Sequence, residues 1–188
     1  MDLQGIIIER LAKKSLGEIM AENIFKPLKM VDTGFTVPAS KRSRLASLYQ
    51  ATSDYSGVEI GKVARPYNIL EDILLSEAPV MTSGGGGLVS TTADYARFAQ
   101  MLLSKGELEG ERILKPETVA LMMTNQLSAE VLKNSANEIL QPSKGLGFGL
   151  NGSVVVDPSA SSTKQAKGTY SWGGAAGTEC TWHGVNCD

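Results

Sequence analysis

Apolar residues recur at helical spacing along the first 25 positions of the chain: Ile6, Ile7, Leu11, Ala12, Leu16, Ile19, Met20, Ile24 and Phe25. Intervals of three and four positions place such residues on one face of an α-helix. Ser15 followed by Glu18 has the spacing of a capping box, which starts a new helix. The pattern therefore predicts two helical pieces over residues 4–25, ending before Pro27.

Two further helices are predicted in the middle of the chain. Thr91 with Asp94 forms a second capping box, and the helix after it has one apolar side: Tyr95, Phe98, Ala99, Leu102 and Leu103. Gly106 stands where a glycine cap ends a helix. Pro116 and Glu117 then occupy the first turn of another helix, whose predicted apolar stripe is Val119, Leu121, Met122 and Met123.

The remaining segments have other patterns. Residues 28–80 show no sustained period and predict a loop-rich region with short helices. From Gly145 onward the chain reads as strands, "GFGLNGSVVVD" and "GTYSWGGAAGTECTW", joined by a polar loop at 158–168. Helices followed by antiparallel strands predict an α+β fold. We expect one domain over 1–188, with helices and loops at 4–144, strands at 145–183 and a tail at 184–188.

The glycines in "TYSWGGAAGTE" interrupt a strand-like stretch. Glycine weakens a strand, so such a cluster indicates a bend or the close approach of another group to the backbone. A bound ligand and a tight bend beside packed helices remain equally open on this evidence.

The composition of the chain limits which classes of binding partner we expect. The chain has 188 residues, 42% hydrophobic and 20% charged, with a net charge of −2. That charge gives no reason to expect nucleic acid or an anionic membrane as a partner. No apolar run approaches a membrane span, and Glu9, Lys13 and Lys14 interrupt any secretory pattern at the amino terminus. We therefore expect no membrane association and favour a cytoplasmic location.

Three residues near the carboxyl end could be metal ligands: Cys180, His183 and Cys187. Structural zinc sites need four ligands, and the sequence contains no other His or Cys. We expect neither a metal site nor another cofactor.

One serine–lysine pair has the spacing used by Ser-Lys hydrolases, Ser161 with Lys164 in "SSTK". In that chemistry the serine opens a buried helix and the lysine helps to take its proton. The pair lies in the polar segment "DPSASSTKQAKG". A solvated loop that matches by chance is the alternative interpretation.

Five stretches, taken in order, resemble the serine β-lactamase and penicillin-binding-protein-like superfamily, and within it the family VIII carboxylesterases related to class C β-lactamases. They are "GEIMAENIFKPLKMVDTGF", "SGGGGLVSTTADYARFAQMLL", "LKPETVALMMTNQL", "GLGFGL" and "YSWGGAAGT". The resemblance implies a β-lactamase-like fold, an antiparallel sheet flanked by helices.

The resemblance also implies a site. Trp172, Gly173 and Gly174 match the Trp-Gly-Gly that esterases of this group carry in place of Lys-Thr-Gly on a strand lining the active site. Ala175 would then donate its backbone N–H to the oxyanion. The glycine run 84–87 resembles a turn that borders the same cleft.

Other family elements have no counterpart in the sequence. The family's Ser-x-x-Lys and Tyr-x-Asn come before the first helix, yet no Tyr-x-Asn occurs and Ser161 lies on the other side of the helices. The chain is thus expected to be an incomplete copy, and an oligomer would complete its sheet.

The expected function is a serine hydrolase acting on short-chain esters through an acyl-serine intermediate, with β-lactams left open. Whether the chain is an enzyme stays open too: the alternative is a non-catalytic remnant that keeps the fold and part of the acyl-binding cleft. A transpeptidase ranks lower, because Trp-Gly-Gly lacks the cation that would meet a substrate carboxylate.

Overall fold

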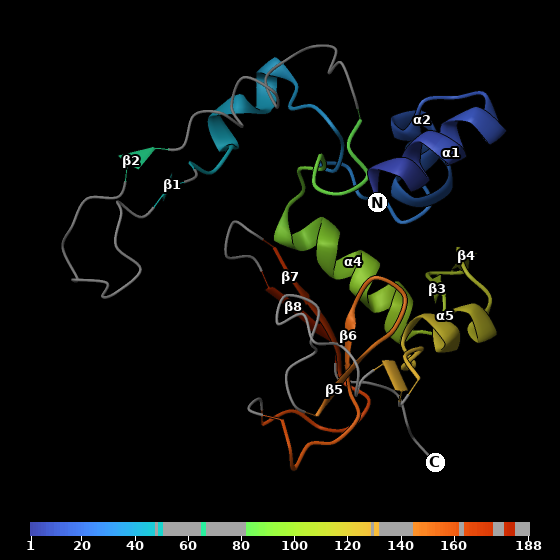
Figure 1. The fold of residues 1–188 in the computed structure, drawn as a ribbon. Coiled ribbons are helices and arrows are strands. Elements are labelled where there is room, and N and C mark those ends of the chain that lie inside the picture. The colour runs from blue at the N-terminus through green and yellow to red at the C-terminus, as the bar shows by residue number, and fades with distance from the viewer. Residues whose placement is uncertain are drawn as a thin grey trace. The chain divides into compact units, whose positions relative to one another are not determined.

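The computed structural model describes residues 1–47, 49–50, 65–66, 82–128, 130–131, 145–161, 164–174 and 179–182. The chain divides into two compact units, Met1–Tyr95 and Ala96–Asp188 (Figure 1). No helix in the described ranges is long and apolar enough to cross a membrane.

The first unit begins with helices α1 (Asp2–Ala12) and α2 (Leu16–Met20), and a π-helical turn, Ala21–Phe25, continues α2. The capping box is present in full: the Ser15 hydroxyl accepts from the Glu18 N–H at 3.3 Å, and the Glu18 carboxylate accepts from the Ser15 N–H at 3.0 Å. Phe25 and Leu28 are buried and anchor the end of this segment. The predicted two-piece helix is confirmed.

Short elements make up the described part of the rest of the first unit, and residues 48, 51–64 and 67–80 of the predicted loop-rich region lie outside the described residues. A 3-10 helix spans Ala39–Arg44, and β1 (Tyr49–Gln50) pairs antiparallel with β2 (Arg65–Pro66). Gly34 and Val89 exchange backbone hydrogen bonds of 3.1 and 2.9 Å across an isolated antiparallel bridge. This bridge joins the turn after α2 to the segment that leads into the next helix.

Helix α4 (Thr92–Leu103) starts where the Thr91 cap predicts, with the Asp94 N–H donating to the Thr91 hydroxyl at 3.2 Å. In a capping box the Asp94 carboxylate would in turn accept a hydrogen bond from the Thr91 N–H. The Asp94 carboxylate instead accepts from the Asp32 N–H at 2.6 Å and from the Thr33 hydroxyl at 2.8 Å. At the other end the Gly106 N–H donates to the Met101 carbonyl at 2.8 Å, which confirms the glycine cap.

The second unit continues with a hairpin of β3 (Glu107–Leu108) and β4 (Glu111–Arg112), followed by α5 (Pro116–Met122). Pro116 opens α5 as predicted. Val119 is buried, but Leu121 is 52% exposed, so the predicted apolar stripe is wrong at that residue. The reason is geometric: two residues farther along a helix is about 200° around its axis, on the opposite face.

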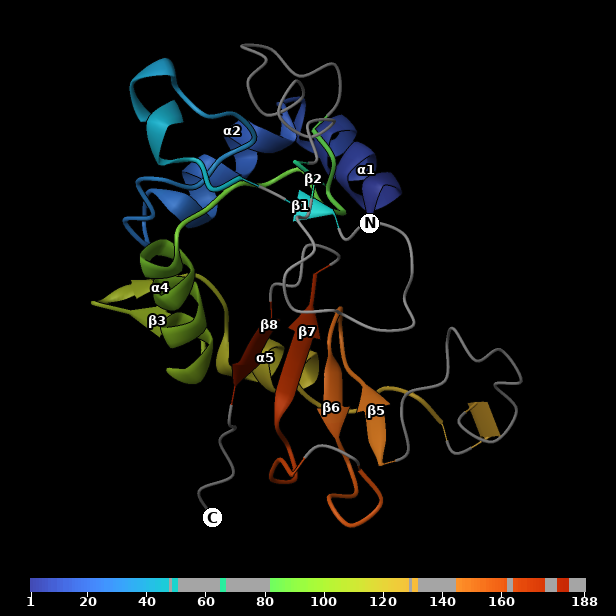
Figure 2. The ribbon, with the colours of Figure 1, turned by 90° about the vertical axis from the view of Figure 1, so that its left-hand side faces the viewer.

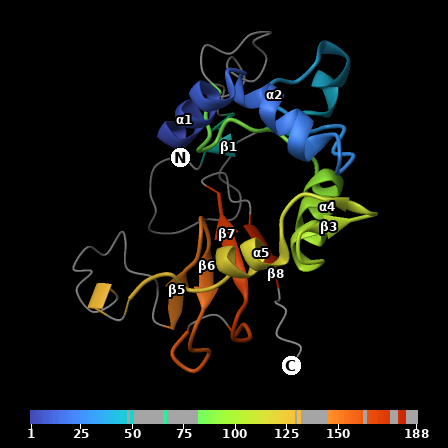
Figure 3. The same cartoon turned by 90° about the vertical axis from the view of Figure 1, so that its right-hand side faces the viewer.

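A four-stranded antiparallel sheet completes the second unit, in the order β5 (Leu146–Phe148), β6 (Ser153–Val155), β7 (Tyr170–Gly173) and β8 (Glu179–Trp182). The four strands lie side by side in Figure 2. Helix α5 crosses one face of the sheet in Figure 3, and Met122 at its end accepts a hydrogen bond of 2.9 Å from the Leu150 N–H. The predicted α+β arrangement with antiparallel strands is confirmed.

Candidate functional site

Strand β7 presents the residues on which the expected site depends. Its burial changes along its length, from buried Tyr170 to exposed Trp172 and Gly173, and Gly174 just beyond it is exposed as well. Trp172 is 48% exposed and pairs in register with Cys180 of β8. Ala175 lies outside the described residues. Strand β7 therefore ends with the exposed indole of Trp172, followed by two exposed glycines that carry no side chain.

The indole of Trp172 is oriented by a second aromatic ring. Phe148, on β5, meets Trp172 edge to face, with ring centroids 5.5 Å apart and planes at 81°. Edge-to-face contacts of this kind add about 1 kcal/mol beyond simple burial. We refer to Phe148 and Trp172 together as the aromatic corner.

Strand β5 is held by a side chain where another strand would otherwise pair. The Asn125 carboxamide oxygen accepts from the Phe148 N–H at 3.0 Å and from the Leu127 N–H at 3.1 Å. The Phe148 carbonyl accepts from the Gln126 N–H at 2.8 Å. Residues 125–126 therefore bond the outward backbone groups of Phe148, and the expectation that the sheet has unpaired edges stays a prediction.

Two glycines allow this close approach. A Cβ at Gly147 would lie 2.4 Å from the Asn125 amide oxygen, and one at Gly149 would lie 2.2 Å from the Met122 carbonyl oxygen. Sequence reasoning assigned no role to Phe148 or Asn125. The signal was present in "GLGFGL", since glycines at alternate positions of a strand indicate close approach of another chain segment.

Tyr170 fixes β7 from inside the unit. Its ring lies against Trp182 at a centroid distance of 5.5 Å, and its hydroxyl donates to the Leu150 carbonyl at 2.6 Å. Burial raises the pKa of the Tyr170 hydroxyl above its usual value of 10.0, because the charged form is poorly solvated there. Strand β7 is thus held at its buried end, Tyr170, while its other end is exposed.

Ser161 and Lys164 lie on the loop between β6 and β7, not on a helix. Ser161 is partly buried, and its N–H donates to the Asp157 carbonyl at 3.2 Å. Lys164 is exposed. Ser159 donates its hydroxyl and its N–H to the Asp157 carboxylate, which lowers the pKa of Asp157 below 3.8. The catalytic role of the pair stays a prediction.

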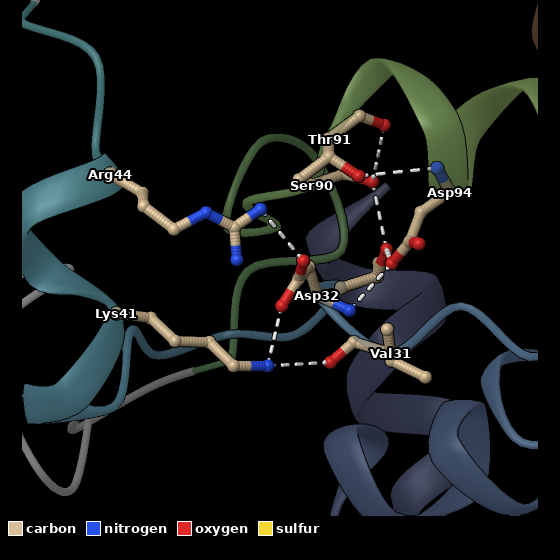
Figure 4. A network of polar contacts seen from close by, with 8 residues as sticks. Val31, Asp32, Lys41, Arg44, Ser90, Thr91 and Asp94 are labelled. Carbon is tan, nitrogen blue, oxygen red and sulfur yellow. Dashed lines mark hydrogen bonds and ion pairs between the residues drawn. The ribbon is translucent and has the colours of Figure 1, made fainter.

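A separate polar cluster lies in the first unit, around Asp32 (Figure 4). The Asp32 carboxylate accepts from Lys41 at 2.5 Å and from Arg44 at 2.9 Å, which lowers its pKa below 3.8. Asp94, only 4% exposed, holds the backbone of the same residue. Sequence reasoning missed this cluster, which ties the turn after α2 to the start of α4.

The glycine run 84–87 also lies in the first unit, against the first turn of α1. The Asp2 carboxylate accepts from the Gly85 N–H at 2.9 Å and from the Ser83 hydroxyl at 2.8 Å. These bonds lower the pKa of Asp2 below 3.8, the Ser83 hydroxyl contributing most. A role of this turn at a cleft stays a prediction.

Among the candidate metal ligands, Cys180 is a partly buried free thiol on β8. His183 and Cys187 lie outside the described residues.

Comparison with known proteins decides the family. The family model described as Beta-lactamase matches residues 1–185. The chain belongs to the beta-lactamase family. Protein Rv1367c of Mycobacterium tuberculosis is 38% identical over 182 residues, covering 95% of this chain and 43% of that protein. Acyltransferase calJ of Penicillium decumbens is 29% identical over 189 residues, covering 94% and 42%. The chain thus spans less than half the length of these relatives.

Solved structures show the same β-lactamase-like fold. EstCE1, a hydrolase with promiscuous acyltransferase activity, matches with a TM-score of 0.74 and 23% identity, over 95% of this chain and 45% of that one. The simvastatin synthase LovD from Aspergillus terreus, as its LovD6 mutant, matches with a TM-score of 0.69 and 22% identity, over 92% and 42%. The octameric penicillin-binding protein homologue from Pyrococcus abyssi matches with a TM-score of 0.52 and 20% identity, over 82% and 28%. The resemblance drawn from the sequence is confirmed at the level of superfamily and fold.

Proposed function

We propose that this beta-lactamase family chain acts as a serine hydrolase on short-chain esters, through an acyl-serine intermediate. The observation that carries the proposal is the end of β7, where exposed Trp172 is followed by two exposed glycines. Without side chains at Gly173 and Gly174, an acyl group can lie along the strand backbone. The hydrolase EstCE1 among the structural neighbours and the relative named acyltransferase calJ support this reaction class.

Ala175 is the proposed oxyanion donor. A backbone N–H pointing at the developing oxyanion stabilises the transition state by roughly 3 kcal/mol. A backbone donor is compatible with an alanine side chain. The β7–β8 ladder, paired from Tyr170–Trp182 to Gly173–Glu179, provides a fixed frame on either side of the connection that contains Ala175.

The proposed substrate is a neutral ester. A carboxylate-bearing peptide substrate needs a cation at the first position of the motif, and that position holds the Trp172 indole. β-Lactams form a second substrate class to be tested, because their acylation also passes through a tetrahedral oxyanion.

Ser161 is the proposed nucleophile for activity of the chain by itself, with Lys164 as its base. A lysine accepts a proton most readily when its ammonium is desolvated, and Lys164 is exposed. That exposure favours the second candidate: a non-catalytic module that keeps the acyl-binding wall.

Two measurements distinguish the enzymatic function from the non-catalytic one. They are mass spectrometry after incubation with a fluorophosphonate, and turnover of p-nitrophenyl butyrate. We expect one stoichiometric adduct, matched by loss of turnover and absent from Ser161→Ala. A folded sample with neither adduct nor turnover would overturn the enzymatic proposal and support the non-catalytic one. A chromogenic cephalosporin in the same assay tests the β-lactam class.

We also propose that the chain associates with itself through β8. Residues 125–126 bond the backbone of Phe148 on the outer side of β5, whereas β8 has no strand on its outer side among the described residues. An unpaired edge is a template for another strand, and the octameric homologue from Pyrococcus abyssi supports oligomerisation. A monomeric mass by light scattering would contradict this proposal.

A further inference from the structure

All the large aliphatic side chains of α1 are exposed. Their exposed fractions run from 37% to 80%, and the residues are Leu3, Ile6, Ile7, Ile8 and Leu11. Leu3, Ile7 and Leu11 follow one another at intervals of four, which places them side by side along the helix surface. Large contiguous apolar patches are rare on soluble monomers and mark interaction surfaces. We refer to these five residues as the α1 patch.

The opposite side of α1 carries short or polar residues and is already occupied. Glu9 accepts from the Leu16 N–H at 2.7 Å and from the Thr82 hydroxyl at 3.0 Å. Asp2, two turns earlier on the same side, is bonded to the glycine turn. A Cβ at Gly5 would lie 3.1 Å from the Leu16 side chain, so there is little room for a larger residue. These contacts fix the rotation of α1 and direct the α1 patch outward.

The order of residues along the α1 patch is symmetric about Ile7. Pairs of similar residues stand at equal distances on either side of it: Ile6 and Ile8, Gln4 and Arg10, and Leu3 and Leu11. A two-fold interface is self-complementary, so residue i of one copy meets residue j of the other and j meets i. Two antiparallel copies of α1 centred on Ile7 therefore place leucine level with leucine and isoleucine level with isoleucine.

The polar residues that flank the α1 patch favour the antiparallel arrangement over a parallel one. Gln4 and Arg10 are exposed, and within the described ranges neither side chain takes part in a hydrogen bond or ion pair. In an antiparallel pair the Arg10 guanidinium lies level with the carboxamide oxygen of Gln4 of the partner subunit, which can accept its N–H. In a parallel pair Arg10 would lie level with Arg10 of the partner subunit, and like charges repel each other.

We propose that the α1 patch is the interface of a homodimer, in which α1 of two copies packs antiparallel around a two-fold axis beside Ile7. The symmetric order favours a second copy as the occupant, because a lipid surface or an unrelated protein needs an apolar face but no symmetry about its centre. One short helix from each copy covers less than the roughly 1,200 Å² of stable complexes. We therefore expect a reversible dimer of micromolar affinity.

This interface is independent of the proposed ester-hydrolysing site and of the proposed association through β8. Helix α1 belongs to the first unit, whereas β7 and β8 belong to the second. The inference therefore stands or falls without any result on esterase activity.

Sedimentation equilibrium of the whole chain, over a range of concentrations, measures the dimer. Ile7→Lys places two ammonium groups at the two-fold axis and is expected to weaken association by roughly tenfold or more. Leu121→Lys makes the same kind of change at an exposed residue of α5 and should leave association unchanged. Circular dichroism checks that both variants are folded. A parent chain that is monomeric throughout, or an Ile7→Lys variant that associates like the parent, would overturn the proposal.

Cross-linking of introduced cysteines tests the direction of the two helices, in a chain that also carries Cys180→Ser and Cys187→Ser. Leu3→Cys alone and Leu11→Cys alone should resist a short thiol-specific cross-linker, since eight positions, about 12 Å, separate the two thiols along an antiparallel pair. An equimolar mixture should cross-link, because the two thiols then lie level. Cross-linking of each variant with itself, and none between the two, would show a parallel pair and overturn the proposal.

Gln4→Glu tests the flanking contact. The substitution gives Arg10 of the partner subunit a carboxylate and is expected to tighten the antiparallel dimer by roughly twofold to tenfold, the range for two exposed ion pairs. In a parallel dimer the same change places two carboxylates level with each other, so weaker association would contradict the arrangement. Vesicles of phosphatidylglycerol test the other occupant. Co-sedimentation with these vesicles of a chain that is monomeric in solution would assign the α1 patch to lipid and overturn the proposal.

Discussion

The carboxamide of Asn125 substitutes for a neighbouring strand beside Phe148. Its oxygen accepts the Phe148 N–H at 3.0 Å, the bond that an adjacent strand would provide at that position. Since Phe148 in turn contacts Trp172, a side chain between α5 and β5 positions one half of the aromatic corner.

Asn125→Ala removes the acceptor of two backbone donors, the N–H groups of Leu127 and Phe148. Leaving partly buried donors without a partner costs about 1–3 kcal/mol each, so we expect the free energy of unfolding to fall by roughly 2–4 kcal/mol in urea titration. Asn125→Asp retains the acceptor and should lose less. Equal stability of Asn125→Ala and the parent chain would contradict this role.

Gly147→Ala should destabilise the same edge. The added methyl group would lie 2.4 Å from the Asn125 amide oxygen, which forces the two segments apart. Overpacking of this kind costs about 1–3 kcal/mol. Gly86→Ala is the control, because a Cβ there meets no atom within 4 Å. Similar thermal unfolding of the two variants would show that β5 tolerates displacement from Asn125.

Asp94→Ala is expected to destabilise the first unit. Asp94 is 4% exposed and accepts from the Asp32 N–H and the Thr33 hydroxyl. Hydrogen bonds to a charged acceptor contribute about 1.5–3 kcal/mol each, so we expect a loss of roughly 3 kcal/mol in chemical denaturation. Glu111→Ala, at an exposed position of β4, should change stability by less than about 0.5 kcal/mol. Equal effects would refute the role of Asp94.

Acid should weaken the contribution of Asp32 to the stability of the folded chain. Lys41 first, and Arg44 second, hold its pKa below the ordinary 3.8. A carboxyl whose pKa is lower in the folded chain stabilises the fold fully above its unfolded pKa, and this stabilisation is lost as the pH falls through the folded value. Asp32→Asn should therefore lower the melting temperature at neutral pH and have little effect well below pH 3.8. An equal effect of the substitution at both pH values would exclude this titration.

Ala175→Pro tests the proposed oxyanion donor by removing its N–H. If the chain hydrolyses esters, kcat should fall by roughly 100- to 1,000-fold, as when one oxyanion donor is lost. Ala175→Gly keeps the N–H and should retain activity. Ala176→Pro controls for the effect of a proline in this segment. The assignment fails if both proline variants lose the same activity, or if Ala175→Pro keeps it.

Local signals in the sequence predicted local structure well. The Ser15–Glu18 capping box and the Gly106 cap each depend on residues a few positions apart, and both formed as the spacing predicts. Thr91 with Asp94 shows where this reasoning stops. The cap is present, but the carboxylate bonds to Asp32 and Thr33, more than sixty positions earlier in the chain. No periodicity encodes a pairing of that range.

In the candidate site, too, neighbouring residues were predictable from the sequence and distant pairs were not. Trp172 and the glycines after it were found through the resemblance, because the motif is contiguous in the sequence. Asn125 and Phe148 are 23 positions apart and meet only when the sheet forms. Alternate glycines in "GLGFGL" indicated that some segment approaches β5, but tertiary packing alone determines which one.

The contrast between the two tryptophans gives this protein two optical reporters. Trp172 is 48% exposed, whereas Trp182 is 4% exposed and lies against Tyr170. Indole emission shifts to the red in water, so the two residues contribute separate components to one fluorescence spectrum, and a soluble quencher reaches mainly the first. A ligand that settles at the end of β7 changes the red component alone, while unfolding of the sheet shifts the blue one.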